Sequence, residues 1–299
     1  MEVIAIDLGS NSLQIVRYNC QKDEIINSFL KTVRTAQGLV ETKRVSKEAI
    51  DGIIKALNEA KEKLNFSSAQ AIVAVTTEAF RVALNAKEAL LEIKDKTNIE
   101  FNIISPEQEA KLTLIAVKKR LEKLGIKKNF VLVDIGGGST EVSFFIDGKI
   151  YSKSFKLGIV TTANSCKSLD EIKQFVEEKS KEIKEFTKEF DTKDLIFTAT
   201  AGTPTTIAAM KHNLTYATYD AKVVTGTKLT INEVDYYLQK LLKMSKKERE
   251  IAVGVGRDDL IVAGVIIFKK LYEILNKQEA IVIDDGLAVG VAVDKCIKG

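Results

Sequence analysis

Short apolar runs recur along the chain, and many of them stop at glycine, serine, threonine or an acidic residue. The first run, Val3 to Ile6, is mostly β-branched and ends in the sequence DLGSNS, and a second run covers Leu13 to Tyr18. Runs bounded in this way are typical of buried strands that end in tight turns. We predict strands at these places and at residues 71–75, 101–105, 195–200 and 280–284.

Between these runs, apolar residues repeat at helical spacing. Ser46 is a suitable N-cap for a helix whose apolar face is formed by Ala49, Ile50, Ile53, Ile54, Leu57, Ala60 and Leu64. Ser105 to Gln108 reads as a capping box with proline at the first helical position, which places Glu109 in the first turn. We also predict helices within 168–189, after Leu229, from Asp258 and at the C-terminus. Strands that alternate with helices predict an α/β fold with a mixed sheet.

An internal repeat divides the chain. The segments IAIDLGSNSLQIVRY (4–18) and VLVDIGGGSTEVSFF (131–145) share an apolar strand, an aspartate, a glycine-containing turn and a second strand. Two hairpins of one design predict two related domains. We place the boundary in the polar segment 121–129, which gives domains of residues 1–122 and 123–299, with a terminal helix at about 287–299 that can pack back on the first domain.

Composition limits the partners of the protein. The chain has 299 residues, of which 45% are hydrophobic and 29% charged, and its net charge is only +4. We therefore expect no nucleic-acid partner, and any anionic ligand must be held by specific residues. The chain shows no basic leader and no apolar stretch long enough for a membrane span, so we expect no membrane association.

The cysteines are few and scattered. Cys20, Cys166 and Cys296 form no CxxC pair, which favours neither a disulfide framework nor a zinc site. We therefore expect a cytoplasmic, reducing location.

Three glycine-containing loops are candidates for phosphate binding. Glycine leaves no Cβ between the backbone amides and a ligand, so successive N–H groups can form an anion-binding nest, and neighbouring hydroxyls can donate further hydrogen bonds. Each loop alone reads more simply as an ordinary turn, but the repetition favours phosphate. The candidate residues are Gly9, Ser10, Asn11, Ser12, Gly136, Gly137, Gly138, Ser139, Thr140, Gly202 and Thr203.

Acidic residues flank two of these loops. Asp7 and Asp134 occupy equivalent strand ends and suit Mg²⁺, although aspartate also caps turns locally. Glu141 follows the second loop and faces either the phosphate site or solvent. We assign Leu13 to the equivalent place in the first repeat, so only one loop carries this acid. Such asymmetry suits a catalyst better than a scaffold.

The ordered motifs AIDLGSNS, VRTAQGL, TTEAFR, SPEQEA, DIGGGSTE, TAGTPTT and GRDDLIVAG resemble the exopolyphosphatase and guanosine pentaphosphate phosphohydrolase family over nearly the whole chain. The chain is similar to the short two-domain form of that family, which belongs to the sugar kinase/actin/heat-shock-chaperone superfamily. The resemblance implies two ribonuclease-H-like (actin-like ATPase) domains with mixed sheets flanking a cleft.

The resemblance also implies an activity and roles for residues. Family members use Mg²⁺ and water to release terminal phosphate from polyphosphate or the 5′ phosphate of guanosine pentaphosphate, a nucleotide of the stringent response. Glu109 would be the general base, and Glu141 the second catalytic acid beside Asp134. Arg34 and Arg81 would bind phosphate oxygens through their planar guanidinium groups. Without the motifs, Glu109 would serve the helix dipole and the arginines surface ion pairs.

Two departures from the family pattern concern the substrate. Asp285 in IDDGLAVG stands where relatives carry a basic residue, and LGIVTTANS lacks an arginine common in the family. Both favour short phosphate chains or a nucleotide over long polyphosphate. The expected partners are polyphosphate, guanosine pentaphosphate or guanosine tetraphosphate, and a homodimer is left open.

Three rival functions fit parts of the sequence. A regulatory sensor would bind guanosine tetraphosphate or pentaphosphate without hydrolysis, but the intact acidic residues oppose it. An ATP-dependent kinase of the same superfamily would need an adenosine pocket that the sequence does not identify. An actin-like filament former is the third rival.

Overall fold

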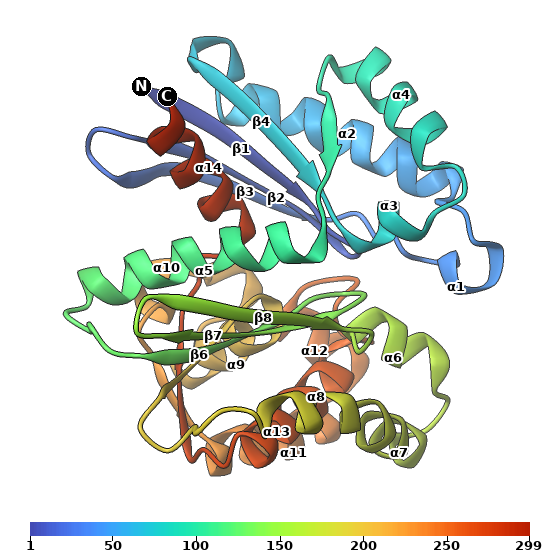
Figure 1. Cartoon of the computed structure of the whole chain (residues 1–299). Helices are drawn as coiled ribbons and strands as arrows, with labels where there is room; N and C mark the ends of the chain where they lie inside the picture. The colour runs from blue at the N-terminus through green and yellow to red at the C-terminus, as the bar shows by residue number, and fades with distance from the viewer. The chain divides into compact units, whose positions relative to one another are not determined.

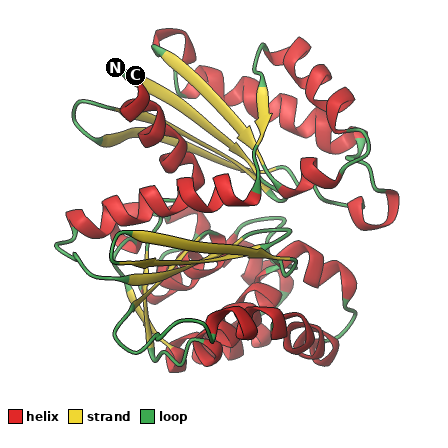
Figure 2. Cartoon of the chain, in the orientation of Figure 1, coloured by secondary structure: helices red, strands yellow, loops and turns green.

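The computed structural model describes residues 1–299 and contains two mixed β-sheets with flanking helices (Figure 1, Figure 2). The chain divides into two compact units: unit 1 is Met1–Ala116 with Gly286–Gly299, and unit 2 is Val117–Asp285. The division falls inside helix α5 (Pro106–Lys123), the helix that also contains the sequence-based boundary between residues 122 and 123. The terminal helix belongs to unit 1.

Unit 1 is built on a five-stranded sheet of order β3-β2-β1-β4-β5. Its strands are β1 (Glu2–Leu8), β2 (Ser12–Asn19), β3 (Glu24–Thr32), β4 (Ala71–Thr76) and β5 (Phe101–Ile103). β1 pairs antiparallel with β2 but parallel with β4, and β4 is parallel to β5. The carboxyl ends of β1, β4 and β5 therefore share one edge of the sheet, which is where open α/β sheets bind ligands.

The helices of unit 1 follow the predicted capping. Ser46 accepts a hydrogen bond from the backbone of Ala49 at the start of α2, and Ser105 and Gln108 exchange hydrogen bonds at the start of α5. Helix α14 packs on β1 and β2. Gly290 lets α14 approach α5 closely, because an added Cβ would lie 2.0 Å from the Leu112 carbonyl oxygen. The helices are α1 (Leu39–Thr42), α2 (Lys47–Lys63), α3 (Glu78–Val82), α4 (Ala86–Thr97), α5 and α14 (Leu287–Lys298).

Unit 2 repeats this sheet and adds an edge strand, in the order β10-β11-β9-β6-β7-β8. Its strands are β6 (Phe130–Ile135), β7 (Thr140–Ile146), β8 (Lys149–Phe155), β9 (Ile196–Thr200), β10 (Lys228–Thr230) and β11 (Glu279–Val282). β6 is antiparallel to β7, whereas β6, β9 and β11 run parallel. The β6, β9 and β11 carboxyl ends thus repeat the arrangement of β1, β4 and β5.

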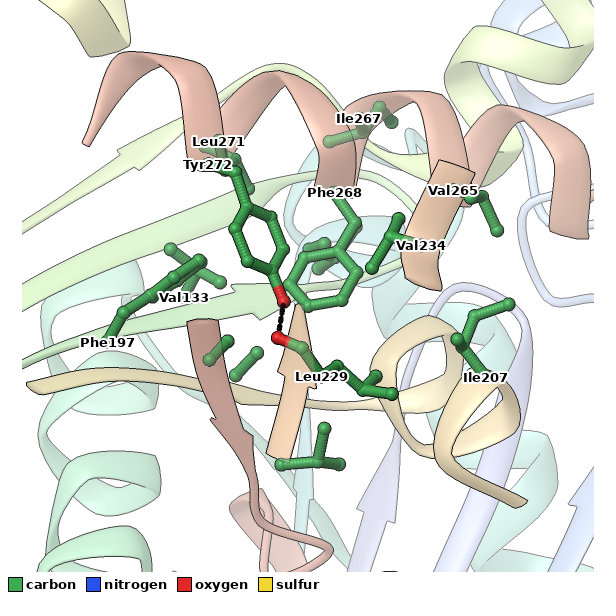
Figure 3. Close-up of a cluster of buried hydrophobic side chains, with 14 of the residues drawn as sticks. Val133, Phe197, Ile207, Leu229, Val234, Val265, Ile267, Phe268, Leu271 and Tyr272 are labelled. Carbon is green, nitrogen blue, oxygen red and sulfur yellow. Dashed lines mark hydrogen bonds between the residues drawn. The ribbon is translucent and has the colours of Figure 1, made fainter. Parts of the chain in front are cut away.

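An aromatic group in unit 2 packs against one face of its sheet. Phe197 on β9 contacts Phe268 and Tyr272 on α13, and the buried Tyr272 hydroxyl donates a 2.7 Å hydrogen bond to the Leu229 carbonyl (Figure 3). Burial of such rings is a major source of folding free energy. The helices are α6 (Ile159–Ser165), α7 (Leu169–Lys179), α8 (Lys181–Thr187), α9 (Gly202–Lys211), α10 (Ala221–Val224), α11 (Ile231–Lys243), α12 (Lys246–Val253) and α13 (Ile261–Ile274).

The cysteine expectation requires a correction. Cys20, directly after β2, forms a disulfide with Cys296 on α14, with the two Cα atoms 5.4 Å apart, and Cys166 is free. The expectation of no disulfide is therefore wrong for this pair, because the fold brings together residues separated by 276 positions. The cysteine pattern consequently gives no support for a reducing location. None of the helices has the length and apolar character needed to cross a bilayer.

Candidate active site

The first glycine loop lies at the carboxyl edge of sheet 1. The Gly9 N–H donates to the Ser12 carbonyl at 3.0 Å, whereas the N–H groups of Ser10 and Asn11 have no acceptor in the protein. The Ser10 and Asn11 carbonyls accept hydrogen bonds from the segment 33–36, including one from the Arg34 N–H at 2.9 Å. This segment therefore holds the loop while two adjacent N–H groups stay available to an anion.

The second loop has the same hydrogen-bond pattern in unit 2. The Gly136 N–H donates to the Ser139 carbonyl at 2.9 Å, and the N–H groups of Gly137 and Gly138 have no acceptor in the protein. The start of α6 supports the loop through Gly158, where an added Cβ would lie 2.3 Å from the Gly137 carbonyl oxygen. The two repeats thus form matched loops that can each receive an anion.

The glycines of these two loops do not adopt a left-handed backbone. None of Gly9, Gly136, Gly137 and Gly138 has a positive φ. An added Cβ on Gly136 would instead lie 3.2 Å from the Ser139 carbonyl oxygen. Space for the tight turn, rather than a left-handed backbone, is therefore what requires glycine at position 136.

The third candidate loop has another geometry. Ala201 carries the positive φ, 70°, and α9 begins at Gly202, so Thr203 lies in the first turn of this helix. The Thr203 side chain is only 1% exposed and packs beside Gly264 of α13. An added Cβ on Gly202 would lie 2.4 Å from Nη2 of Arg257, which donates to the Gly202 carbonyl. This loop is joined to α13 packing and to the half-buried Arg257 of the GRDDLIVAG motif.

The strand register around Glu141 shows which residue of the first repeat is its counterpart. Asp134 pairs with Glu141 across β6 and β7, and Asp7 pairs with Gln14 across β1 and β2. The counterpart of Glu141 is therefore Gln14, and the assignment of Leu13 to that place is wrong. Leu13 instead matches Thr140, because Leu8 pairs with Leu13 and Ile135 with Thr140.

Both catalytic candidates are held by neighbours. Glu141 is 3% exposed and accepts a 2.6 Å hydrogen bond from the Ser154 hydroxyl on β8. Glu109, in the first turn of α5, accepts a 2.8 Å hydrogen bond from Nη1 of Arg81. Arg81 also binds Glu78 on its own helix. Neither Ser154 nor Glu78 was identified from the sequence. The i,i+3 spacing of Glu78 and Arg81 in TTEAFR is nevertheless a local signal for their ion pair.

Asp7 has a buried carboxyl group with an unsatisfied oxygen. Its Oδ1 is buried without a hydrogen bond, and burial raises its pKa to about 7. Asp134 stands at the equivalent place in β6. No group of three or more histidine, cysteine, aspartate or glutamate side chains is arranged to hold a metal ion. Any ion bound at Asp7 would need further ligands from water or from substrate.

Asp285, the departure noted in the sequence, makes an ion pair inside unit 2. Arg120 donates from Nε and Nη2 to its two carboxylate oxygens, at 2.5 and 3.0 Å. Its neighbour Asp284 has a pKa raised to about 7, chiefly by burial, and is hydrogen-bonded by Tyr219. The charge of Asp285 is thus compensated within the protein.

The arrangement yields two groups of candidate residues, one at the carboxyl edge of each sheet. Unit 1 brings together Asp7, the loop 9–12, Arg34 and the Arg81–Glu109 pair, and unit 2 brings together Asp134, the loop 136–140, Glu141 and the turn at Gly202. Loops with available N–H groups beside carboxylates suit phosphoryl transfer, which depends on positioning and charge stabilisation.

Comparison with known sequence families identifies the family to which the chain belongs. A sequence model of the Ppx/GppA phosphatase family matches residues 3–298, and the chain therefore belongs to that family of phosphohydrolases. It is 28% identical to exopolyphosphatase 2 of Mycobacterium tuberculosis over 93% of this chain and 92% of that protein. It is 26% identical to a bifunctional 3-dehydroquinate synthase/phosphatase of Fusobacterium nucleatum, covering 97% of this chain but 46% of that protein.

Solved structures agree with the fold. The crystal structure of the Aquifex aeolicus Ppx/GppA family member superposes with a TM-score of 0.79 at 31% identity, over 100% of this chain and 98% of that one. An exopolyphosphatase from Cytophaga hutchinsonii gives a TM-score of 0.87 at 18% identity, over 100% and 98% of the two chains, and supports the fold alone. The predicted α/β fold with two mixed sheets is confirmed.

Proposed function

We propose that the chain is a Mg²⁺-dependent phosphohydrolase that releases terminal phosphate from inorganic polyphosphate, the 5′ phosphate of guanosine pentaphosphate, or both. The observation that carries the proposal is the matched pair of loops, each with two adjacent N–H groups without an acceptor and each beside an aspartate. Backbone amides in this arrangement bind phosphate oxygens. The exopolyphosphatase among the relatives supports the substrate class.

In the proposed reaction, Glu109 accepts a proton from the attacking water. The water oxygen forms a bond to the terminal phosphorus, the bridging P–O bond breaks, and the bridging oxygen leaves with its electron pair on the shortened chain or nucleotide. Little covalent help is needed from the protein, because positioning and charge neutralisation dominate phosphoryl transfer. Arg34, Arg81 and the loop amides would neutralise phosphate charge, and Glu141, held by Ser154, would orient the water or a metal-bound group.

Magnesium fits the chemistry of the available donors. The proposed ligand in unit 1 is Asp7, whose buried Oδ1 makes no hydrogen bond, and the proposed ligands in unit 2 are Asp134 and Glu141. Carboxylate oxygens supplemented by water and substrate phosphates are the usual ligands of Mg²⁺. When bound, the ion would neutralise charge on the phosphate oxygens.

Phosphate release by the purified chain tests the proposal. Long-chain polyphosphate and guanosine pentaphosphate would be offered separately with Mg²⁺ or with EDTA. We expect Mg²⁺-dependent release that falls by about 10²–10⁴-fold in Glu109→Gln and is unchanged in Glu88→Gln, a matched change at an exposed glutamate of unit 1. Binding of guanosine pentaphosphate without release from either substrate would contradict the proposal and favour the sensor. Light scattering of the same sample would show whether the chain forms a homodimer, which the sequence leaves open.

A further inference from the structure

The guanidinium of Arg81 is held on several sides in unit 1. Its Nε donates to Glu78 at 3.0 Å, and its Nη1 donates both to Glu109 and to the Ile104 carbonyl, each at 2.8 Å. Its Nη2 is buried and makes no hydrogen bond in the protein. Three elements thus fix the group: α3, α5 and the chain directly after β5.

The two carboxylates that bind Arg81 are largely shielded from water. The side chains of Glu78, Arg81 and Glu109 are 21%, 14% and 13% exposed. Charged hydrogen bonds in such surroundings hold side chains more firmly than exposed pairs do. Glu107 is the other carboxylate that acts electrostatically on Arg81, but it is exposed and bound to Ser105. The position of Arg81 is therefore set mainly by Glu78, Glu109 and the Ile104 carbonyl.

The Nη2 group indicates what this arrangement is for. A buried N–H without an acceptor costs about 1–3 kcal/mol, so such groups need an explanation. Arginine paired with a single carboxylate commonly binds it through two nitrogens. Because Glu78 occupies Nε and the Ile104 carbonyl shares Nη1, Arg81 binds Glu109 through one nitrogen only. The remaining donor suits one oxygen of an anionic ligand.

We propose that Glu78 is a positioning residue of the active site, which holds Arg81 so that Nη1 orients Glu109 and Nη2 is reserved for a substrate phosphate oxygen. This inference rests on the proposed phosphohydrolase function. Without the Glu78 carboxylate, Arg81 is free to turn and bind Glu109 through two nitrogens. Glu109 would then be a weaker base, and the phosphate oxygen would lose a donor.

The test compares Glu78→Gln, Glu78→Asp and the control Glu88→Gln across a pH series. Removing the negative charge of Glu78 lowers the pKa of Glu109, so the acid limb of the kcat/KM profile moves to lower pH in Glu78→Gln. We expect kcat/KM to fall about tenfold at the optimum, with a higher KM from the lost phosphate contact. Glu78→Asp, which keeps the charge, should return the acid limb to its wild-type position.

A second readout does not need activity. Carbon-13 NMR of labelled glutamate carboxyl groups, with the Glu109 signal assigned by its absence in Glu109→Gln, reports the titration of Glu109 directly. We expect that titration to move to lower pH in Glu78→Gln and to stay unchanged in Glu88→Gln. An unmoved Glu109 titration together with a wild-type pH profile would overturn the role of Glu78. Equal loss of activity at every pH, with lower melting temperature and an unmoved titration, would show a purely structural role and overturn it too.

The proposed phosphohydrolase function and the proposed role of Glu78 can be disproved independently. If the wild-type chain releases no phosphate, the proposed function is wrong, yet the NMR titration still shows whether Glu78 controls Glu109. If the wild-type chain is active and Glu78→Gln behaves as Glu88→Gln does, only the role of Glu78 is wrong.

Discussion

Units 1 and 2 have the same arrangement of core strands but different chemistry at the edge of the sheet. In each, an antiparallel hairpin encloses a loop whose first glycine N–H donates to the serine carbonyl three residues later. The aspartate before that loop faces Gln14 in unit 1 and Glu141 in unit 2. The carboxylate of unit 1 comes instead from Glu109 on α5. The two units therefore share a candidate anion-binding loop, while the candidate catalytic acids come from different elements.

The paired positions Glu141 and Gln14 provide the strongest test of this difference between the two units. We expect Glu141→Gln to lower kcat for phosphate release by about 10²–10³-fold, because a buried carboxylate beside the proposed reaction site is lost. Gln14→Ala should change kcat less than about threefold, since the amide carries no charge to supply. A loss in Gln14→Ala as large as that in Glu141→Gln would show that the two hairpins contribute equally. Melting curves of both variants serve as the folding control.

The disulfide gives a second contrast, because Cys20–Cys296 lies in unit 1 while unit 2 has only the free Cys166. Cys20→Ser or a reducing agent should lower the free energy of unfolding of unit 1 by about 2–4 kcal/mol, since the bond restricts the unfolded chain. Calorimetry with and without reductant measures this, and Cys166→Ser is the matched control. Identical melting under both conditions would indicate that the α14 packing needs no covalent link.

The stability of unit 2 should also depend on pH. Burial raises the pKa of Asp284 to about 7, above the value of about 3.9 for an unfolded aspartate. The folded state then binds the proton more tightly, so the stabilising contribution is complete below about pH 4 and is lost as the pH rises through about 7. We expect Asp284→Asn to remove most of this pH dependence of the free energy of unfolding. Denaturant titrations from pH 4 to 8 measure it, and a wild-type slope retained in Asp284→Asn would contradict the assignment.

Much of the fold could be predicted from local patterns. Strands with three or more consecutive buried residues, such as β1, β4, β6, β9 and β11, have apolar runs that stand out in the sequence. The outer strands β3 and β8 were not predicted, because most of their side chains are exposed or half-buried and the apolar signal is weak. The capping residues Ser46 and Ser105 were found correctly, since a cap depends on neighbours three residues away.

The candidate site could be predicted only in part. The glycine loops, their aspartates and the candidates Glu109, Glu141 and Arg81 come from motifs that are contiguous in the sequence. Their catalytic and binding roles stay predictions until variants are measured. The supports of these residues were missed, because Ser154 reaches Glu141 through strand pairing and Arg81 reaches Glu109 across two helices.

Local sequence thus decided the strand and helix types, the repeat and the family, because each depends on hydrophobic spacing, turn residues or contiguous motifs. Only the assembled fold shows that Ser154 lies beside Glu141, that Cys20 meets Cys296, and that Arg120 compensates Asp285. Each of these depends on strand register or on contacts between distant segments. A shift of one residue in register turns a side chain to the opposite face of a sheet, so such relations follow only from the assembled fold.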